Sequence, residues 1–171
     1  LQDEDVVIAS GSFAPGKLTV LSIMRDQMYL CHAFLNHYRA LGVEQFVILD
    51  DASTDGTTAF LEGQPDVVRL ISPLRYGDEV FVPSHNRTER AGNAWRLPMI
   101  ERFGYDCWTV VADSDEFLML QPGETLPSLI STIDAQCPDA RVLWGAMLDV
   151  YPRDMAAFEA AQVDAELVLD D

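Results

Sequence analysis

Short apolar segments alternate with helix-like segments along this chain, and the alternation limits its fold more than any other feature. The strand-like segments, rich in β-branched and apolar residues, are 17–24, 44–50, 66–72 and 107–113. Helical spacing or helix-capping residues mark the segments between them, 29–42, 53–63 and 93–104. Gly42 is placed to end the first helix. Such alternation predicts an α/β fold, with a mostly parallel sheet flanked by helices.

The remaining segments extend this pattern. Residues 73–92 contain Pro73, Gly77 and Pro83 and show little periodicity, which predicts a long loop of the kind that often carries function. Pro98 must either start or kink the helix over 93–104. A further helix is expected over 125–133 and a further strand over 140–148. The acidic segment 153–171 ends without a capping element, so we expect the sequence to be part of a longer chain.

The charge of the chain limits its partners. With 171 residues it is long enough for one globular domain, and its net charge is −17, from 28 acidic and 11 basic residues. This charge would repel phosphate backbones, so nucleic acid is not expected as a partner. If a chain this acidic binds a nucleotide, some of its carboxylates are expected to act through a divalent cation.

The cysteines and the apolar runs indicate where the protein works. Cys31, Cys107 and Cys137 are far apart and form no CxxC pair, which favours a reducing compartment over a disulfide framework or a zinc site. No apolar run reaches the roughly 20 residues that span a bilayer. We therefore predict a cytoplasmic location without a transmembrane segment, with peripheral membrane contact left open.

The stretch "LDDASTDGTTAFLE", residues 49–62, allows three interpretations. Counted from Asp51, its oxygen-bearing residues fall at the positions of a calcium-binding loop, with Glu62 as the twelfth. A second interpretation is a solvated turn whose polar side chains cap a helix. The third is a ligand-binding loop at the carboxyl end of a strand. A calcium loop of this type is entered from a helix, whereas a strand is expected here, so the third interpretation is favoured.

A second acidic stretch, "DSDE", follows the apolar segment 107–113 directly. Its first and third residues, Asp113 and Asp115, can together approach one divalent cation that carries phosphate oxygens. The spacing alone is weak evidence, because Asp3 and Asp5 show it too. The position at the carboxyl end of a buried strand, where parallel sheets bind ligands, distinguishes Asp113 and Asp115.

Four stretches together resemble the nucleotide-sugar glycosyltransferases of the GT-A fold, in their family-2-like branch. They are "MRDQMYL" after the opening strand, "HYRALGVEQFVILDDASTDGT", "WRLPMIERFGYDCWTVVADSDEFLMLQP" and "MLDVYP". They match in order and spacing over most of residues 18–152. The family usually has DADE where this chain has "DSDE", which keeps the carboxylates of the DxD motif. It usually has Asn-Glu where this chain has Asp26 and Gln27, which would alter a contact near the nucleotide.

The resemblance implies a Rossmann-like nucleotide-binding domain over residues 18–152, preceded by an extension or edge segment over 1–17. Residues 153–171 would then begin an acceptor part that is largely missing. The implied reaction transfers a sugar, with inversion, from a UDP- or GDP-sugar to a glycan, lipid or protein acceptor. Asp50 or Asp51 would contact the base.

The resemblance also implies a metal site and its neighbours. Asp115 would bind Mn²⁺ or Mg²⁺, with Asp113 supporting the metal or contacting the ribose. The arginines placed to approach the diphosphate are Arg87, Arg90 and Arg96.

The catalytic base is the least determined residue. Asp149 in "MLDVYP" follows the last expected strand and is available, although an Asp there equally often caps a turn. The other titratable candidates are the three histidines, His32, His37 and His85. Two further functions stay open: a relative that binds nucleotide without turnover, and a calcium-binding interaction module.

Overall fold

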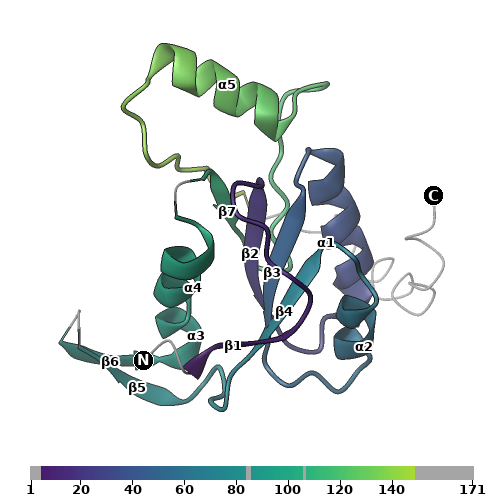
Figure 1. Ribbon diagram of the computed structural model, residues 1–171, viewed down its shortest axis with the longest axis vertical. Helices are drawn as coiled ribbons and strands as arrows, with labels where there is room; N and C mark the ends of the chain where they lie inside the picture. The colour runs from purple at the N-terminus through teal and green to yellow at the C-terminus, as the bar shows by residue number, and fades with distance from the viewer. Residues whose placement is uncertain (1–4, 84–85, 106, 149–171) are drawn as a thin grey trace. The chain divides into compact units, whose positions relative to one another are not determined.

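A five-stranded sheet forms the centre of the fold. The computed structural model describes residues 5–83, 86–105 and 107–148. The sheet has the spatial order β1-β4-β3-β2-β7 (Figure 1). Its strands are β1 (Val7–Ser10), β2 (Thr19–Met24), β3 (Gln45–Asp50), β4 (Val67–Ile71) and β7 (Thr109–Val111). The last four run parallel, and β1 lies antiparallel to β4 at one edge. The predicted α/β class and mostly parallel sheet are confirmed.

Helices cover both faces of this sheet. The helices of this part of the chain are α1 (Met28–Ala40), α2 (Thr57–Glu62), α3 (Ala91–Ala94) and α4 (Arg96–Phe103). Figure 1 shows α1 and α2 on one face, with α3 and α4 on the other. After α1 the chain turns at Gly42, whose φ of 95° lies in the left-handed region that glycine adopts readily. This glycine ends the first helix as predicted.

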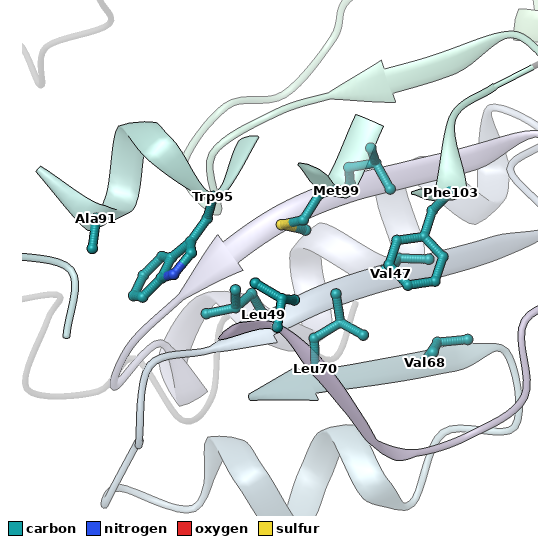
Figure 2. Close-up of a cluster of buried hydrophobic side chains, with 10 residues drawn as sticks. Val47, Leu49, Val68, Leu70, Ala91, Trp95, Met99 and Phe103 are labelled. Carbon is teal, nitrogen blue, oxygen red and sulfur yellow. The ribbon is translucent and has the colours of Figure 1, made fainter. Parts of the chain in front are cut away.

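The side-chain alternation of β3 divides the core into two layers. Phe46 faces α1, where its ring lies 6.4 Å from the ring of Phe34. Val47, the next residue, belongs to a buried cluster with Trp95 and Phe103 on the opposite face (Figure 2). Trp95 is fully buried, and truncating such a residue to alanine typically costs about 3–5 kcal/mol. The two-residue period of the strand therefore decides which helix each side chain packs against.

The structure differs from the sequence-based expectation in the segment 73–92. This segment is not a loop throughout, because it contains an antiparallel hairpin of β5 (Glu79–Val82) and β6 (Arg87–Arg90). The helix predicted over 93–104 is two consecutive helices, α3 and α4. Pro98 is the third residue of α4. In the first turn of a helix the missing N–H leaves no intrahelical hydrogen bond unmade, so Pro98 is tolerated there.

The chain divides into two units, Leu1–Phe117 and Leu118–Asp171, so the boundary lies inside the predicted 18–152 domain. In the second unit, α5 (Leu126–Gln136) confirms the helix predicted over 125–133, and the Thr125 side chain caps it. The strand predicted over 140–148 is wrong for 141–148, which form no regular secondary structure and are exposed. An apolar strand needs a neighbour to satisfy its backbone groups, and the described residues give it none. No helix in the described ranges is long and apolar enough to cross a bilayer.

Candidate functional site

The strand order creates a crevice at the carboxyl edge of the sheet. From β2 the chain proceeds to β3 and β4 on one side, and it then returns to β7 on the other side of β2. Open α/β sheets bind ligands where the strand order reverses in this way. A pocket of about 410 Å³ lies at this place. It is lined by residues from four strand ends, including Arg25 after β2, Asp51 after β3, Tyr76 and Gly77 after β4, and Ser114 after β7.

Asp51 is the buried charge of this pocket. Its side chain is 0% exposed, and its Oδ2 accepts a hydrogen bond of 3.1 Å from the backbone N–H of Tyr76. Within the described residues, Oδ1 has no hydrogen-bond partner. Two guanidinium groups lie near the carboxylate: Arg25 Nη1 is 3.5 Å from Oδ2, and Arg75 Nη1 is 3.8 Å from Oδ1. A buried carboxylate oxygen without a donor is costly, so it is suited to accept a donor from a ligand.

The backbone is strained just after β2 and just after β3. Asp26, next to Arg25, has a φ of 51°, and Ala52, next to Asp51, has a φ of 53°. Residues other than glycine pay about 1–2 kcal/mol for this left-handed conformation. Such outliers are frequent at ligand sites, where the surrounding structure holds them in place. The strain supports a functional role for this edge of the sheet.

The loop 51–56 fastens the start of α1. Asp55 Oδ2 accepts from the backbone N–H of Met28 at 2.9 Å, and Thr57 Oγ1 accepts from that of Gln27 at 2.9 Å. Ser53 Oγ accepts from the backbone N–H of Asp26 at 2.9 Å. The Gln27 side chain makes no capping hydrogen bond, so Asp55 satisfies the free N–H of Met28, the first residue of α1, while Thr57 and Ser53 hold the two residues before it. We call this group of hydrogen bonds the α1 clamp.

The α1 clamp also explains the titration of Asp55. Desolvation acts to raise its pKa, but the hydrogen bonds from the Thr57 hydroxyl and from the backbone N–H groups of Met28 and Thr57 act in the opposite direction. The result is a pKa below the ordinary value of an Asp. The hydrogen bonds of the folded protein thus stabilise the carboxylate form of Asp55.

Several polar side chains that a calcium loop over residues 51–62 would use form hydrogen bonds or ion pairs with other parts of the protein. Ser53 and Asp55 belong to the α1 clamp, and Glu62 pairs with Arg69 at 2.6 Å. The loop is entered from β3 and not from a helix, as expected from the sequence. Among the described residues, no group of three or more His, Cys, Asp or Glu side chains is placed to hold a metal ion.

The two aspartates at the end of β3 have different surroundings. Asp50 is buried among protein donors: its side chain accepts from the Thr58 hydroxyl at 2.5 Å and the Ser53 backbone N–H at 3.0 Å, and it pairs with Arg69 at 3.4 Å. Only Asp51 lines the pocket. Of the two residues that the resemblance assigns to the base, Asp51 is the one in position to reach a ligand.

The "DSDE" stretch forms a fixed turn after β7. Asp113 Oδ1 accepts from Arg96 Nη2 at 2.6 Å, which ties the turn to α4. The backbone N–H of Asp113 donates to Glu116 Oε2 at 2.9 Å, and that of Glu116 donates back to the Asp113 carbonyl at 3.0 Å. Ser114 is buried against the pocket, whereas Asp115 is exposed. The turn therefore places one paired and one exposed carboxylate beside the pocket residue Ser114.

The carboxylates at this turn fit a divalent cation that takes only one or two of its ligands from the protein. Mg²⁺ usually binds proteins through one or two carboxylates and takes its remaining ligands from water and substrate phosphates. Asp113 and Asp115 supply two such carboxylates. A cage made of protein ligands alone is not found among the described residues.

The remaining residues singled out from the sequence lie in different settings. Arg87 pairs with Glu89 at 2.6 Å on β6, and Arg90 is exposed before α3; neither lines the pocket. The His32 ring packs on Phe60, and the His37 ring packs between Tyr38 and Phe117. Asp149 and His85 lie outside the described residues.

The pocket residues Arg25 and Tyr76 were not identified from the sequence, nor was Arg75, which lies 3.8 Å from Asp51. Arg25 directly follows the predicted strand 17–24, so the strand-end argument used for Asp113 would have found it. Arg75 and Tyr76 lie in a turn before the unpredicted β5–β6 hairpin, and no local pattern marks them. Comparison of the chain with protein-family models, curated proteins and solved structures found no match in any of the three.

Proposed function

We propose that the chain carries the donor site of a metal-dependent glycosyltransferase, which transfers a sugar from a nucleotide-diphospho-sugar to a glycan, lipid or protein acceptor. The observation that carries this proposal is the buried Asp51 oxygen without a donor, in a pocket at the reversal point of the strand order. The "DSDE" turn at the end of β7, which lies on the other side of β2 from β3, adds carboxylates next to the pocket residue Ser114. The resemblance to the GT-A family supports the same assignment.

In this proposal the base lies against Asp51, and the diphosphate extends toward the end of β7. Asp113 and Asp115 would hold Mn²⁺ or Mg²⁺, which supplies charge neutralisation for the departing nucleoside diphosphate. Arg96 keeps Asp113 in position through its hydrogen bond of 2.6 Å. An anionic ligand is bound best beside cationic side chains, and the half-exposed Arg25 and Arg75 provide two of them next to Asp51.

The acceptor hydroxyl must lose a proton during transfer, which requires a base beside the sugar. Asp149 stays the prediction for this role, and inversion stays the predicted stereochemistry. Both depend on residues outside the described ranges.

Thermal melting of the 171-residue chain tests the proposal directly. The conditions are Mn²⁺ alone, UDP or GDP alone, and each nucleotide with Mn²⁺. A ligand at a hundred times its Kd stabilises by about 2.7 kcal/mol, and a protein of this size gains roughly 2–4 °C per kcal/mol. We expect the shift to require nucleotide and metal together.

Asp115→Asn should remove the metal-dependent part of this shift in Tm, and Asp134→Asn on exposed α5 is the matched control. A metal-dependent shift that survives Asp115→Asn would contradict the metal role.

A second candidate is a protein that binds the nucleotide without turnover. The pairing of Asp113 with Arg96 favours it, because a carboxylate held by an arginine is less available to a metal. Donor hydrolysis by the purified chain separates the candidates. Metal-dependent release of free sugar supports the enzyme, and nucleotide binding without any release supports the binding protein.

A further inference from the structure

Helix α1 holds the residue that directly follows Asp115. The Tyr38 hydroxyl, on α1, donates a hydrogen bond of 3.0 Å to the backbone carbonyl of Glu116. Tyr38 is 1% exposed, and a buried tyrosine hydroxyl without a partner would cost free energy. The bond joins two segments that are 78 residues apart in the sequence. It therefore fixes the backbone at the end of the "DSDE" turn to the helix.

Phe117, the next residue, packs on the same helix. Its ring meets the ring of His37 at a centroid distance of 5.2 Å and the ring of Phe34 at 6.3 Å, both edge-on. Phe34 is fully buried, so Phe117 is attached to the core layer between α1 and the sheet. The hydrogen bond and the ring contacts thus hold two consecutive residues where the chain leaves the turn.

The start of the turn is held from the opposite face of the sheet. Arg96, the first residue of α4, donates a hydrogen bond of 2.6 Å to Asp113. Figure 1 shows α4 and α1 on opposite faces. The Glu116 side chain closes the turn by accepting from the backbone N–H of Asp113 at 2.9 Å. The exposed Asp115 therefore lies between two anchors, one on each face of the sheet.

A cation that takes few ligands from the protein depends strongly on how those ligands are held. Mg²⁺ demands near-octahedral geometry, so a carboxylate that moves freely must first be ordered when the ion binds. Groups that hold metal ligands in place by hydrogen bonds affect metal affinity although they never touch the metal. Tyr38 is related to Asp115 in this way, through the backbone of the adjacent Glu116.

We propose that Tyr38 is a positioning residue for a divalent cation at the "DSDE" turn, and that it acts through the backbone of Glu116 on Asp115. This inference rests on the proposed function, because it presupposes the metal at that turn. It also makes α1 the common support of both sides of the pocket. The start of the helix is joined by the α1 clamp to the loop after Asp51, and its later turns hold the residues after Asp115.

Tyr38→Phe removes the hydroxyl and keeps the ring, so it tests the hydrogen bond alone. Isothermal titration of the 171-residue chain with UDP and GDP, each with and without Mn²⁺, gives the gain in nucleotide affinity that the metal produces. We expect Tyr38→Phe to reduce this gain by about two- to tenfold, equivalent to one neutral hydrogen bond, and to leave the affinity without metal unchanged. An unchanged gain, or an equal loss with and without Mn²⁺, would overturn the inference and leave the proposed function standing.

A double variant separates positioning from a general loss of stability. Asp115→Asn removes the carboxylate through which Tyr38 acts, so adding Tyr38→Phe to it should lower nucleotide affinity in Mn²⁺ no further. Additive losses would assign Tyr38 a structural role alone and overturn the inference. Tyr105→Phe, at a site that is 75% exposed, is the control and should match the wild type. If the wild-type chain binds neither nucleotide more tightly with Mn²⁺, the proposed function fails, and the inference fails with it.

Discussion

The backbone N–H of Tyr76 donates a hydrogen bond of 3.1 Å to Oδ2 of Asp51, joining the turn after β4 to the end of β3. The bond occupies one oxygen of a buried carboxylate, and the other oxygen has no hydrogen-bond partner among the described residues. The hydrogen bond that orients Asp51 thus comes from the backbone, while the Arg25 and Arg75 side chains lie 3.5 and 3.8 Å away. A side chain that replaces Asp51 with the same shape would be held in the same way.

Asp51→Asn is expected to change which base the pocket prefers. The amide oxygen can keep the hydrogen bond from Tyr76, which places the NH₂ group where Oδ1 was. The pocket then presents a donor, so the affinity for CDP relative to UDP should rise. Titration with both nucleotides measures this ratio, with Asp139→Asn at an exposed site as the control. A ratio that stays at its wild-type value would mean that Asp51 does not read the base.

Cys31 is expected to resist alkylation in the native state. Burial, and secondarily the charge of Asp55, raises the pKa of this thiol from 9.0 to about 11. At pH 8 this leaves about a hundredfold less thiolate, and the thiolate is the reactive form. The exposed Cys137 should therefore react with iodoacetamide well before Cys31. Mass spectrometry of tryptic peptides measures the order, and unfolding in guanidinium should abolish the difference. Equal rates in the folded protein would contradict the burial of Cys31.

The sequence predicted the fold best where the pattern was local. β2, β3 and β4 were each found from a continuous apolar run, because both faces of a parallel strand are buried. The 107–113 prediction was too long, since β7 has three residues, and the 140–148 prediction was wrong for the described residues. Whether an apolar run becomes a strand depends on a partner strand, which composition does not encode.

The candidate site was predictable only in part. Asp51 and Asp113 follow long apolar runs, so the strand-end rule placed them at the correct edge of the sheet. The distinction between Asp50 and Asp51 could not be drawn, because it depends on Arg69 and Thr58 capturing the first of them. Tyr76 was missed because its place at the pocket depends on contact between its ring and Gly92, sixteen residues further along the chain.

The Arg39–Asp66 pair is expected to give acid-dependent stability. The hydrogen bonds from Arg39, at 2.8 and 2.6 Å, hold the pKa of Asp66 below its ordinary value of 3.8, against a smaller effect of desolvation. A lowered native pKa means that the pair stabilises the fold above the unfolded value, about pH 4, and that this stability is lost as the pH falls through the native value. Both side chains are partly exposed, so we expect a loss of about 1 kcal/mol at pH 7 in Asp66→Asn.

Urea unfolding at pH 7 and at successively lower pH measures that loss. The difference between wild type and Asp66→Asn should shrink as wild-type Asp66 becomes protonated. Asp139→Asn should show no such pH-dependent difference. A difference that is constant from pH 7 to pH 3 would contradict the assignment of the lowered pKa to the ion pair.

The α1 clamp is expected to position Arg25 at the pocket as well as to stabilise α1. Asp55→Ala removes the acceptor for the Met28 N–H and for the Thr57 hydroxyl, and losing a helix-terminal acceptor typically costs about 1 kcal/mol. This corresponds to a drop in Tm of roughly 2–4 °C. Since Arg25 lies only three residues before Met28, loosening the start of α1 should also weaken UDP binding. Asp55→Asn keeps one acceptor oxygen and should lie between wild type and Asp55→Ala in both measurements. If Asp55→Ala lowers the Tm and leaves UDP affinity unchanged, the clamp serves α1 alone, and Arg25 is positioned by its own contact with Asp51.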